Sequence, residues 1–426
     1  MKSLRKATGI ILALAVVLCA CVIAASAAEK KDDYKNEYPF VFVHGFNGWG
    51  GAEGLNGLIP YWGATTGDLM AYLQSEGYDC YSASVGPISS AWDRACELYA
   101  QLTGTTVDYG AAHSAEHNHK RYGRTYDEPL FEGWGQKSID GKTKKINLIG
   151  HSFGGTTIRL FTYLMTYGCK EEVKAAGKDV SPLFTGGKES FIESVTTICT
   201  PHNSSSIYKF TEETGVYDLT LFLSTIYCSV LGRSPLNGVM VDFHLEQFGI
   251  TNTPGEYDAD LYFKSIVNFL KNSDDTCEND LLPENAQKMN DMIEISPDVY
   301  YFSYAFDATH KSSLTGLTWP DTGTNPVIAP LGTWMGHRLE FTNEETGVTY
   351  GDEWRPNDML VNTISETYPF DEPHTDFDGT GTPQKGIWNV MPVQRGDHGQ
   401  AIGLLSDTKE TREFYKTLAE MLCKLK

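Results

Sequence analysis

Several features that define whole classes of protein are missing from this chain of 426 residues. Its nine cysteines form no Cys-x-x-Cys pair and are irregularly spaced, which argues against a disulfide framework and against a thiolate zinc site. Basic residues are in the minority: the chain has 34 lysines and arginines against 55 aspartates and glutamates, so its formal net charge is −21. We therefore expect a soluble protein that binds neither nucleic acid nor anionic lipid headgroups.

Long apolar runs are also scarce, and the one at residues 9–25 follows three basic residues and precedes a stretch of small ones. This arrangement is typical of a secretory signal peptide. We predict that residues 1–27 are removed, with cleavage after Ala27, and that the mature protein is secreted and extracellular. Cleavage takes the formal charge from −21 to −24, since three basic residues leave. Without repeats, low-complexity tracts or Pro/Ser-rich linkers, residues 28–426 are predicted to form a single domain.

Strand-like and helix-like segments alternate along this domain. The strand-like runs occupy residues 38–45, 146–152, 193–202 and 299–306, and the helix-like segments include 66–77 and 90–102. The alternation is typical of an α/β fold with a mainly parallel sheet and helices on both faces. Because such sheets carry their sites at the carboxyl ends of the strands, we expect the polar residues at those ends to be neighbours.

Residues 150–154, Gly-His-Ser-Phe-Gly, match the G-x-S-x-G pattern of a serine nucleophile. An apolar run precedes the motif and a helix-like segment follows it. A sharp turn between strand and helix holds the serine in a strained conformation, and the helix N-terminus directs free N–H groups toward a developing oxyanion. We predict that Ser152 is the nucleophile, and an ordinary glycine-rich turn is the alternative.

The turn His44-Gly45-Phe46 follows the first strand-like run, at the same edge of the predicted sheet. It can direct the backbone N–H of Phe46 at a substrate carbonyl oxygen, with the N–H of Phe153 as second donor. Each such donor contributes roughly 3 kcal/mol of transition-state stabilisation. The two motifs together favour an oxyanion hole over a simple turn of the chain.

A serine hydrolase of this kind needs an acid and then a base after the nucleophile in the chain. His398 lies close enough to the C-terminus to be the base, and His202, which follows a strand-like run, competes with it. Asp358 and Asp307 are the candidates for the acid, and Asp307 follows the cleaner strand signal. Spacing alone leaves the choice of acid open.

Three histidines, His113, His117 and His119, lie within seven residues, and Asp93 stands twenty residues upstream. Imidazole combined with carboxylate suits Zn²⁺. On one continuous helix His113 and His117 would share a face, whereas His113 and His119 can converge only if the helix is broken. A solvated histidine-rich surface is the alternative to a metal site.

Several long segments, spread from end to end of the domain, carry a family resemblance. They are VFVHGFNGWGG, VGPISSAWDRACELYAQLTGTTVDYGAAHSAEHNHKRYGRTY, SPLFTGG, SVTTICTPHNSSS, LTGLTWP, NDMLVNT and KGIWNVM. Over nearly all of its mature length the chain resembles the zinc-containing thermoalkalophilic true lipases of Gram-positive bacteria, which belong to the α/β-hydrolase superfamily. The resemblance implies an α/β-hydrolase fold with a zinc-tethered insertion at about residues 90–125 and a helical lid at about 207–233.

The resemblance also implies residue roles. The family's nucleophile, acid and base fall on Ser152, Asp358 and His398, so Asp307 is not expected to act. Its metal ligands fall on Asp93, His113, His119 and Asp275. If the alignment with the family shifted by one residue, Asp274 would take the place of Asp275. Four protein ligands leave no open coordination position, so the zinc is expected to be structural rather than to activate water.

Two further family features are less clear in this sequence. Family members bind calcium through a backbone oxygen that matches Gly323 and an acid two residues after the base. Here that acid is replaced by Gln400, although Asp407 lies nearby. Losing a carboxylate weakens a Ca²⁺ site, so we assign no calcium ligands. The apolar residues of 207–233 fit either a buried core helix or, as in the family, a lid that meets a lipid–water interface.

These features predict a secreted triacylglycerol lipase that cleaves acylglycerol esters through a Ser-His-Asp triad and an acyl-enzyme intermediate. A carboxylesterase for short, soluble esters would use the same site and is the nearest alternative. An inactive α/β-hydrolase used for binding is disfavoured, because every residue of the predicted triad is present. No obligate protein partner is indicated.

Overall fold

The computed structural model describes residues 34–139, 141–214, 242–251 and 259–426. The predicted signal peptide, residues 1–27, and residues 215–233 of the predicted lid lie outside these ranges. None of the helices in the described ranges is long and apolar enough to cross a membrane. The six cysteines in the same ranges are free thiols, and five of them are buried.

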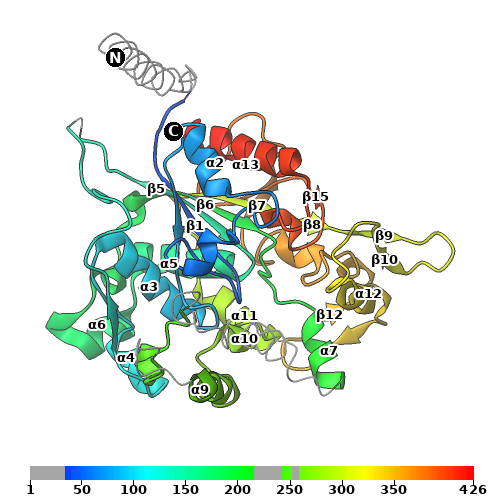
Figure 1. The fold of residues 1–426 in the computed structure, drawn as a ribbon, viewed down its shortest axis with the longest axis horizontal. Helices are drawn as coiled ribbons and strands as arrows, with labels where there is room; N and C mark the ends of the chain where they lie inside the picture. The colour runs from blue at the N-terminus through cyan, green and yellow to red at the C-terminus, as the bar shows by residue number, and fades with distance from the viewer. Residues whose placement is uncertain (1–33, 140, 215–241, 252–258) are drawn as a thin grey trace, which may run out of the picture.

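A seven-stranded sheet forms the centre of the molecule (Figure 1). Its strands, in spatial order, are β13 (His374–Asp376), β14 (Trp388–Val390), β7 (Tyr300–Tyr304), β6 (Ile192–Ile198), β5 (Ile146–His151), β1 (Phe40–Val43) and β2 (Cys80–Ala83). All neighbouring strands are parallel. Each strand-like run found in the sequence contains one of these strands, so the prediction of a mainly parallel sheet is confirmed.

Both faces of the sheet are buried, and its side chains alternate between them. In β1, Val41 and Val43 pack into one apolar cluster, whereas Phe40 and Phe42 pack into another on the opposite face. The β1 strand is therefore apolar along its whole length, as expected for a strand of a parallel sheet covered on both sides.

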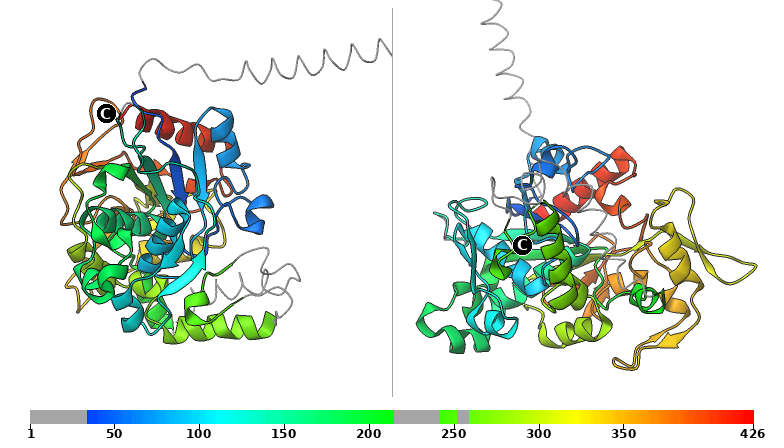
Figure 2. Two further views of the ribbon diagram at one scale, coloured as in Figure 1. Left: turned by 90° about the vertical axis from the view of Figure 1, so that its left-hand side faces the viewer. Right: turned by 60° about the horizontal axis from the view of Figure 1, so that its bottom comes forward.

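Helices pack against both faces of the sheet (Figure 2). Residues of α3 (Ala91–Thr103) and α5 (Phe153–Tyr167) share the first cluster, and those of α2 (Leu69–Ser75) and α13 (Thr408–Cys423) share the second. The predicted helices at 66–77 and 90–102 are α2 and α3. The α3 helix begins where the Ser90 side chain accepts the N–H of Asp93, and it ends at Gly104, whose φ is 63°.

Further elements lie outside the sheet and these four helices. The helices are α4 (Ala111–Glu116), α6 (Lys170–Ala176), α7 (Ile207–Thr214), α9 (Ala259–Asn272), α10 (Cys277–Asp280), α11 (Pro283–Met292) and α12 (Ala329–His337). The strand pairs are β3 (Thr106–Asp108) with β4 (Tyr122–Thr125), β8 (Phe306–Asp307) with β15 (Gln394–Arg395), β9 (Thr309–Lys311) with β10 (Thr318–Pro320), and β11 (Phe341–Thr342) with β12 (Thr349–Tyr350). The chemistry-bearing residues lie on these further elements, at the start of α3, and on the turns at the ends of the sheet strands.

Candidate functional site

Ser152 occupies the turn between β5 and α5, and it is half-buried. Its backbone has φ 56° and ψ −129°, a conformation that is strained for a residue with a side chain. The flanking glycines are needed for steric reasons. A Cβ on Gly150 would lie 2.5 Å from the backbone of Gly154, and a Cβ on Gly154 would lie 2.1 Å from the carbonyl oxygen of Val43. The sequence motif thus forms the strained strand–turn–helix expected of a nucleophile.

The turn after β1 lies directly against Ser152. A Cβ on Gly45 would be 2.8 Å from the Cβ of Ser152, so only glycine permits this approach. Phe153 is the first residue of α5, and its N–H has no acceptor within the helix. Phe46 follows Gly45 in the adjoining turn. The two predicted oxyanion donors therefore belong to segments that meet at Ser152.

A buried arginine that sequence reasoning missed holds this turn in place. Arg94 of α3 donates to the carbonyl oxygens of His44 and Gly86 and, through Nε, to the hydroxyl of Thr157 at 2.9 Å. Burial lowers the pKa of the guanidinium to about 10, so it remains charged at neutral pH. The signal available in the sequence was a basic residue on the apolar face of a helix.

His398 and Asp358 are in direct contact. The Nδ1–H of His398 donates to Oδ2 of Asp358 at 2.5 Å, and the backbone N–H of His398 donates to the carbonyl oxygen of Asp358 at 2.9 Å. The other carboxylate oxygen, Oδ1, accepts the N–H groups of Leu360 and Val361 at 2.9 and 2.7 Å. Burial opposes ionisation of Asp358, but the charge of His398 and these hydrogen bonds outweigh it and lower the pKa of the carboxyl group.

Asp307 and His202, the other candidates for the acid and the base, have different partners. Asp307 pairs with Arg395 at 2.7 Å, and its Oδ1 accepts the N–H of Thr309. His202 is buried, with Nε2 3.1 Å from the hydroxyl of Thr197, and its ring packs against Trp388. The structure therefore brings Asp358, and not Asp307, to His398.

A chain of hydrogen bonds links His398, the predicted base, to the turns at the end of the sheet. The N–H of Gly45 donates to the Tyr61 hydroxyl at 2.9 Å, and that hydroxyl donates to His151 Nδ1 at 2.7 Å. His151 Nε2–H then donates to the carbonyl oxygen of His398 at 3.0 Å. Burial and the neighbouring His398 lower the pKa of His151, so this imidazole is neutral, as its two roles require. Sequence reasoning treated His151 only as a variable position of the motif and missed Tyr61.

The predicted metal ligands come together beside α3. One donor atom from each of Asp93, His113, His119 and Asp275 lies within 4.8 Å of the others. Asp275 Oδ2 is 3.3 Å from Nε2 of both histidines, and Asp93 Oδ1 is 3.3 Å from Nε2 of His113. The α4 helix ends at Glu116, and Asn118, with φ 56°, turns the chain so that His119 points back beside His113. The helix is broken as the resemblance required.

The chemistry of this cluster suits a cation. Asp93 Oδ1, Asp275 Oδ1 and His119 Nε2 are buried and have no hydrogen-bond partner among the described residues. Burial and the charge of Asp275 raise the pKa of Asp93 to about 6, and the two carboxylates overcome burial to raise the pKa of His113 to about 10. The site thus combines two carboxylates with two imidazoles, and several of their oxygen and nitrogen atoms have no hydrogen-bond partner. This combination favours a bound cation.

Residues around the cluster orient its ligands. His119 donates from Nδ1 to the carbonyl oxygen of Lys120 at 2.8 Å, and Gln247 donates to Asp93 Oδ2 at 2.7 Å. The ring of His113 stacks on Trp92. Asp274 instead points outward, with its side chain 74% exposed, and pairs with His117 at 2.9 Å. The geometry favours Asp275 over Asp274 as the fourth ligand.

The residues near Gly323 do not fit calcium. The amide nitrogen of Gln400 lies 3.3 Å from the carbonyl oxygen of Gly323 as a hydrogen-bond donor, and its amide oxygen accepts the N–H of Asp397. Asp407 caps α13 by accepting the N–H groups of Lys409 and Glu410. A hydrogen bond thus joins the two groups that a cation would bridge.

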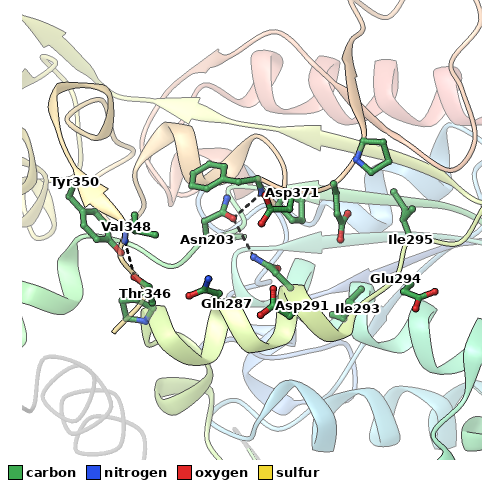
Figure 3. Close-up of a pocket in the computed structure, with 16 residues that line it drawn as sticks. Asn203, Gln287, Asp291, Ile293, Glu294, Ile295, Thr346, Val348, Tyr350 and Asp371 are labelled. Carbon is green, nitrogen blue, oxygen red and sulfur yellow. Dashed lines mark hydrogen bonds between the residues drawn. The ribbon is translucent and has the colours of Figure 1, made fainter. Parts of the chain in front are cut away.

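The described part of the predicted lid is α7, which carries Phe210 against Trp334 of α12. A separate cavity of about 520 Å³ lies between α11 and the segments 346–350 and 369–373 (Figure 3). Asn203 lines it and accepts the N–H of Phe370 at 3.1 Å. Its lining residues include no member of the predicted triad, so this cavity is distinct from the candidate active site.

Comparisons with known proteins agree with the fold and the resemblance. Residues 36–426 match the family model described as "Lipase-like, C-terminal domain". The chain is 36% identical over 415 residues to a lipase of Staphylococcus hyicus, covering 94% of this chain and 60% of that protein. It thus spans about 60% or less of the length of the curated relatives that it matches.

Two solved structures illustrate the similarity. The Staphylococcus hyicus lipase structure has a TM-score of 0.75 at 35% identity, with 94% of this chain and 98% of that chain covered. The structure of lipase 1 from Pelosinus fermentans has a TM-score of 0.77 at 38% identity, with 92% and 100% covered. The α/β-hydrolase fold and the resemblance to lipases of Gram-positive bacteria, both predicted from the sequence, are therefore confirmed.

Proposed function

Because the chain belongs to the family of lipase-like C-terminal domains, we propose that it is a triacylglycerol lipase that hydrolyses the carboxylic esters of acylglycerols. The observation that carries this proposal is the contact of His398 with Asp358, joined through His151 to the strained turn that bears Ser152. Ser152, Asp358 and His398 supply a nucleophile, an orienting acid and a base, in the chain order of this fold.

In the acylation step, His398 removes the proton of the Ser152 hydroxyl as its oxygen attacks the ester carbonyl carbon. Asp358 keeps the Nδ1–H tautomer, which leaves Nε2 free to act as the base, and it stabilises the imidazolium that forms. The imidazolium then protonates the departing alcohol oxygen, and the acyl group remains on Ser152. The low pKa of Asp358 ensures that the acid is ionised whenever His398 needs it.

The negative charge that develops on the carbonyl oxygen is held by the N–H groups of Phe46 and Phe153. Both donors belong to backbone that packs against Ser152, so little reorganisation accompanies the reaction. Deacylation repeats the sequence with water, which His398 deprotonates for attack on the acyl-enzyme. The products are a fatty acid and free Ser152.

We further propose that Asp93, His113, His119 and Asp275 hold a structural Zn²⁺. When bound, the ion supplies a charge that neutralises the two buried carboxylates. It would join α3 and the β3–α4–β4 extension to the segment that precedes α10, and the zinc-binding insertion at about residues 90–125 contains three of its four ligands. All steps on the ester belong to the triad and the oxyanion donors.

Secretion and interfacial action complete the proposal. Residues 1–27 act as a signal peptide, and residues 28–426 form one catalytic domain whose lid lies at about 207–233. The described start of this lid, α7, rests on α12 through Phe210 and Trp334, a contact that can separate without disturbing the sheet. Lid opening would present apolar surface to a lipid–water interface.

Initial rates on p-nitrophenyl esters, from butyrate to palmitate, test the proposal with the mature protein and its Ser152→Ala variant. A lipase should retain or increase its rate with long chains, and the variant should be inactive and resist labelling by a fluorophosphonate. A collapse of activity beyond short chains would make the protein a carboxylesterase. Activity that survives in the variant would remove Ser152 from the mechanism.

A further inference from the structure

A second carboxyl group lies behind the proposed triad. Glu366 is the last residue of the 3₁₀ helix η7 (Thr363–Glu366), and its side chain is fully buried. Its Oε2 accepts the backbone N–H of Phe306 at 2.6 Å. Its Oε1 is buried too, and none of the described residues directs an N–H group or a hydroxyl at it. One oxygen of Glu366 is therefore paired and the other is not.

Glu366 lies beside Asp358, the predicted catalytic acid. A carboxyl oxygen of Glu366, one of Asp358 and the sulfur of Cys199 lie within 4.8 Å of one another. The hydrogen bonds in this region are divided unequally between the two carboxyl groups. Asp358 accepts three of them, from His398, Leu360 and Val361, whereas Glu366 accepts one. The environment therefore favours negative charge on Asp358.

Two adjacent buried carboxyl groups cannot both ionise without strong repulsion. Burial, followed by the charge of Asp358, raises the pKa of Glu366 well above its ordinary value, and Asp307 adds to the effect. The Cys199 thiol is neutral as well, because burial and the charge of Asp358 raise its pKa. The pair thus carries one negative charge, and the shared proton belongs to Glu366.

We propose that Glu366 is a positioning residue that stays protonated and donates a hydrogen bond from Oε1 to the carboxylate of Asp358. The inference rests on the proposed triad, since its consequence is exerted through Asp358 on His398. A neutral donor fixes the orientation of the Asp358 carboxylate and disperses part of its charge. The carboxylate of Asp358 is then less basic toward His398 than that of an isolated aspartate.

The variants Glu366→Gln and Glu366→Leu separate this role from its alternatives. Glutamine reproduces the neutral acid, because its carbonyl oxygen can accept the N–H of Phe306 while its amide N–H donates to Asp358. Leucine fills a similar volume and donates nothing. Two readouts are needed: the pH dependence of kcat/KM on a soluble ester, and the pKa of His398 followed by ¹⁵N NMR of histidine-labelled protein.

For Glu366→Gln we expect kcat/KM within about twofold of wild type and an unchanged pKa of His398. For Glu366→Leu we expect kcat/KM to fall about tenfold and the acidic limb to move up by about one pH unit, since Asp358 becomes more basic. A lower pKa of His398 in the glutamine variant would show that Glu366 is ionised in the wild type, and would overturn the proposal. So would a leucine variant that keeps the wild-type rate and the wild-type pKa.

Two features keep the test decisive. If the leucine variant does not fold, the glutamine variant alone still distinguishes a neutral from an ionised Glu366 by the NMR titration of His398. If Ser152→Ala is fully active, the proposed function fails, but the same titration reports on Glu366 without any need for catalysis. The two failures are therefore separable.

Discussion

Replacement of Asp275 by asparagine, with Asp274→Asn as the matched control, tests the proposed metal centre. The two aspartates are adjacent in the chain, yet only Asp275 is buried, 3.3 Å from Nε2 of both His113 and His119. Asp274 is exposed and contacts His117 outside the cluster. The Asp275→Asn variant should therefore lose the bound metal, whereas the Asp274→Asn variant should keep it.

The size of the effect follows from linkage between metal binding and folding. A metal present at about 1,000 times its Kd stabilises the folded state by about 4 kcal/mol, and the Asp275 variant forfeits this contribution. Unfolding entropies of about 2.1 cal/mol/K per residue, over roughly 390 residues, amount to about 0.8 kcal/mol/K. The thermal midpoint should thus fall by about 5 °C in the Asp275 variant and by less than about 1 °C in the control.

The assay combines metal content by mass spectrometry, the thermal midpoint by calorimetry, and hydrolysis of p-nitrophenyl butyrate at low temperature. A chelator should lower the wild-type midpoint to that of the Asp275 variant and leave the initial rate in the cold unchanged, because the metal takes no part in the reaction. Immediate loss of activity on chelation, in protein that remains folded, would refute the structural role. Equal metal loss in both variants would refute the choice of Asp275.

Three other outcomes are expected. Asp358→Asn should lower kcat/KM at least 100-fold, because an amide nitrogen would face the Nδ1–H of His398. Asp307→Asn should keep kcat/KM within about threefold of wild type, and a larger loss in this variant than in Asp358→Asn would make Asp307 the catalytic acid. Calcium should not raise the thermal midpoint of the metal-loaded wild type, but it should raise that of Gln400→Glu, in which a carboxylate replaces the amide that donates to Gly323. A calcium-stabilised wild type would contradict this. The folded pKa of Asp358 is lowered, so its stabilising contribution is complete above the unfolded pKa of about 3.9 and is lost as the pH falls through the folded value. The difference in unfolding free energy between wild type and Asp358→Asn, measured with urea, should accordingly shrink below about pH 4, and a constant difference would argue against the low pKa.

Sequence patterns anticipated the parts of the site that depend on local conformation. The apolar runs predicted the strands, and the two flanking glycines together with the helix-like segment predicted the turn at Ser152. The His-rich segment also indicated that His119 could join His113 only if the helix broke, and Asn118 breaks it. Each of these inferences concerns residues within one or two turns of each other in the chain, where spacing translates directly into geometry.

Contacts between segments that are distant in the sequence could not be predicted from residue spacing. Spacing could not decide between Asp358 and Asp307, and the structure shows that Asp307 is engaged by Arg395. Neither Tyr61 nor Glu366 could be singled out in the sequence, because the role of a buried tyrosine or glutamate depends on the groups that pack around it. Hydrogen bonds run from Gly45 through Tyr61 and His151 to His398. The last of them joins two residues that lie 247 positions apart in the sequence.

By itself the sequence determined the class of fold and the local frame of the nucleophile, since periodic burial and glycine sterics are local properties of the chain, and its resemblance to known lipases indicated the family. The resemblance implied Asp358 as the acid and Asp275 as the fourth metal ligand, but only the tertiary structure shows Asp358 in contact with His398 and Asp275 facing the metal cluster. It alone reveals a second acid behind Asp358. These contacts depend on the path of the chain between sheet strands. That path brings residues hundreds of positions apart within a few ångströms, and it decides which of two buried carboxyl groups receives the hydrogen bonds that stabilise its charge.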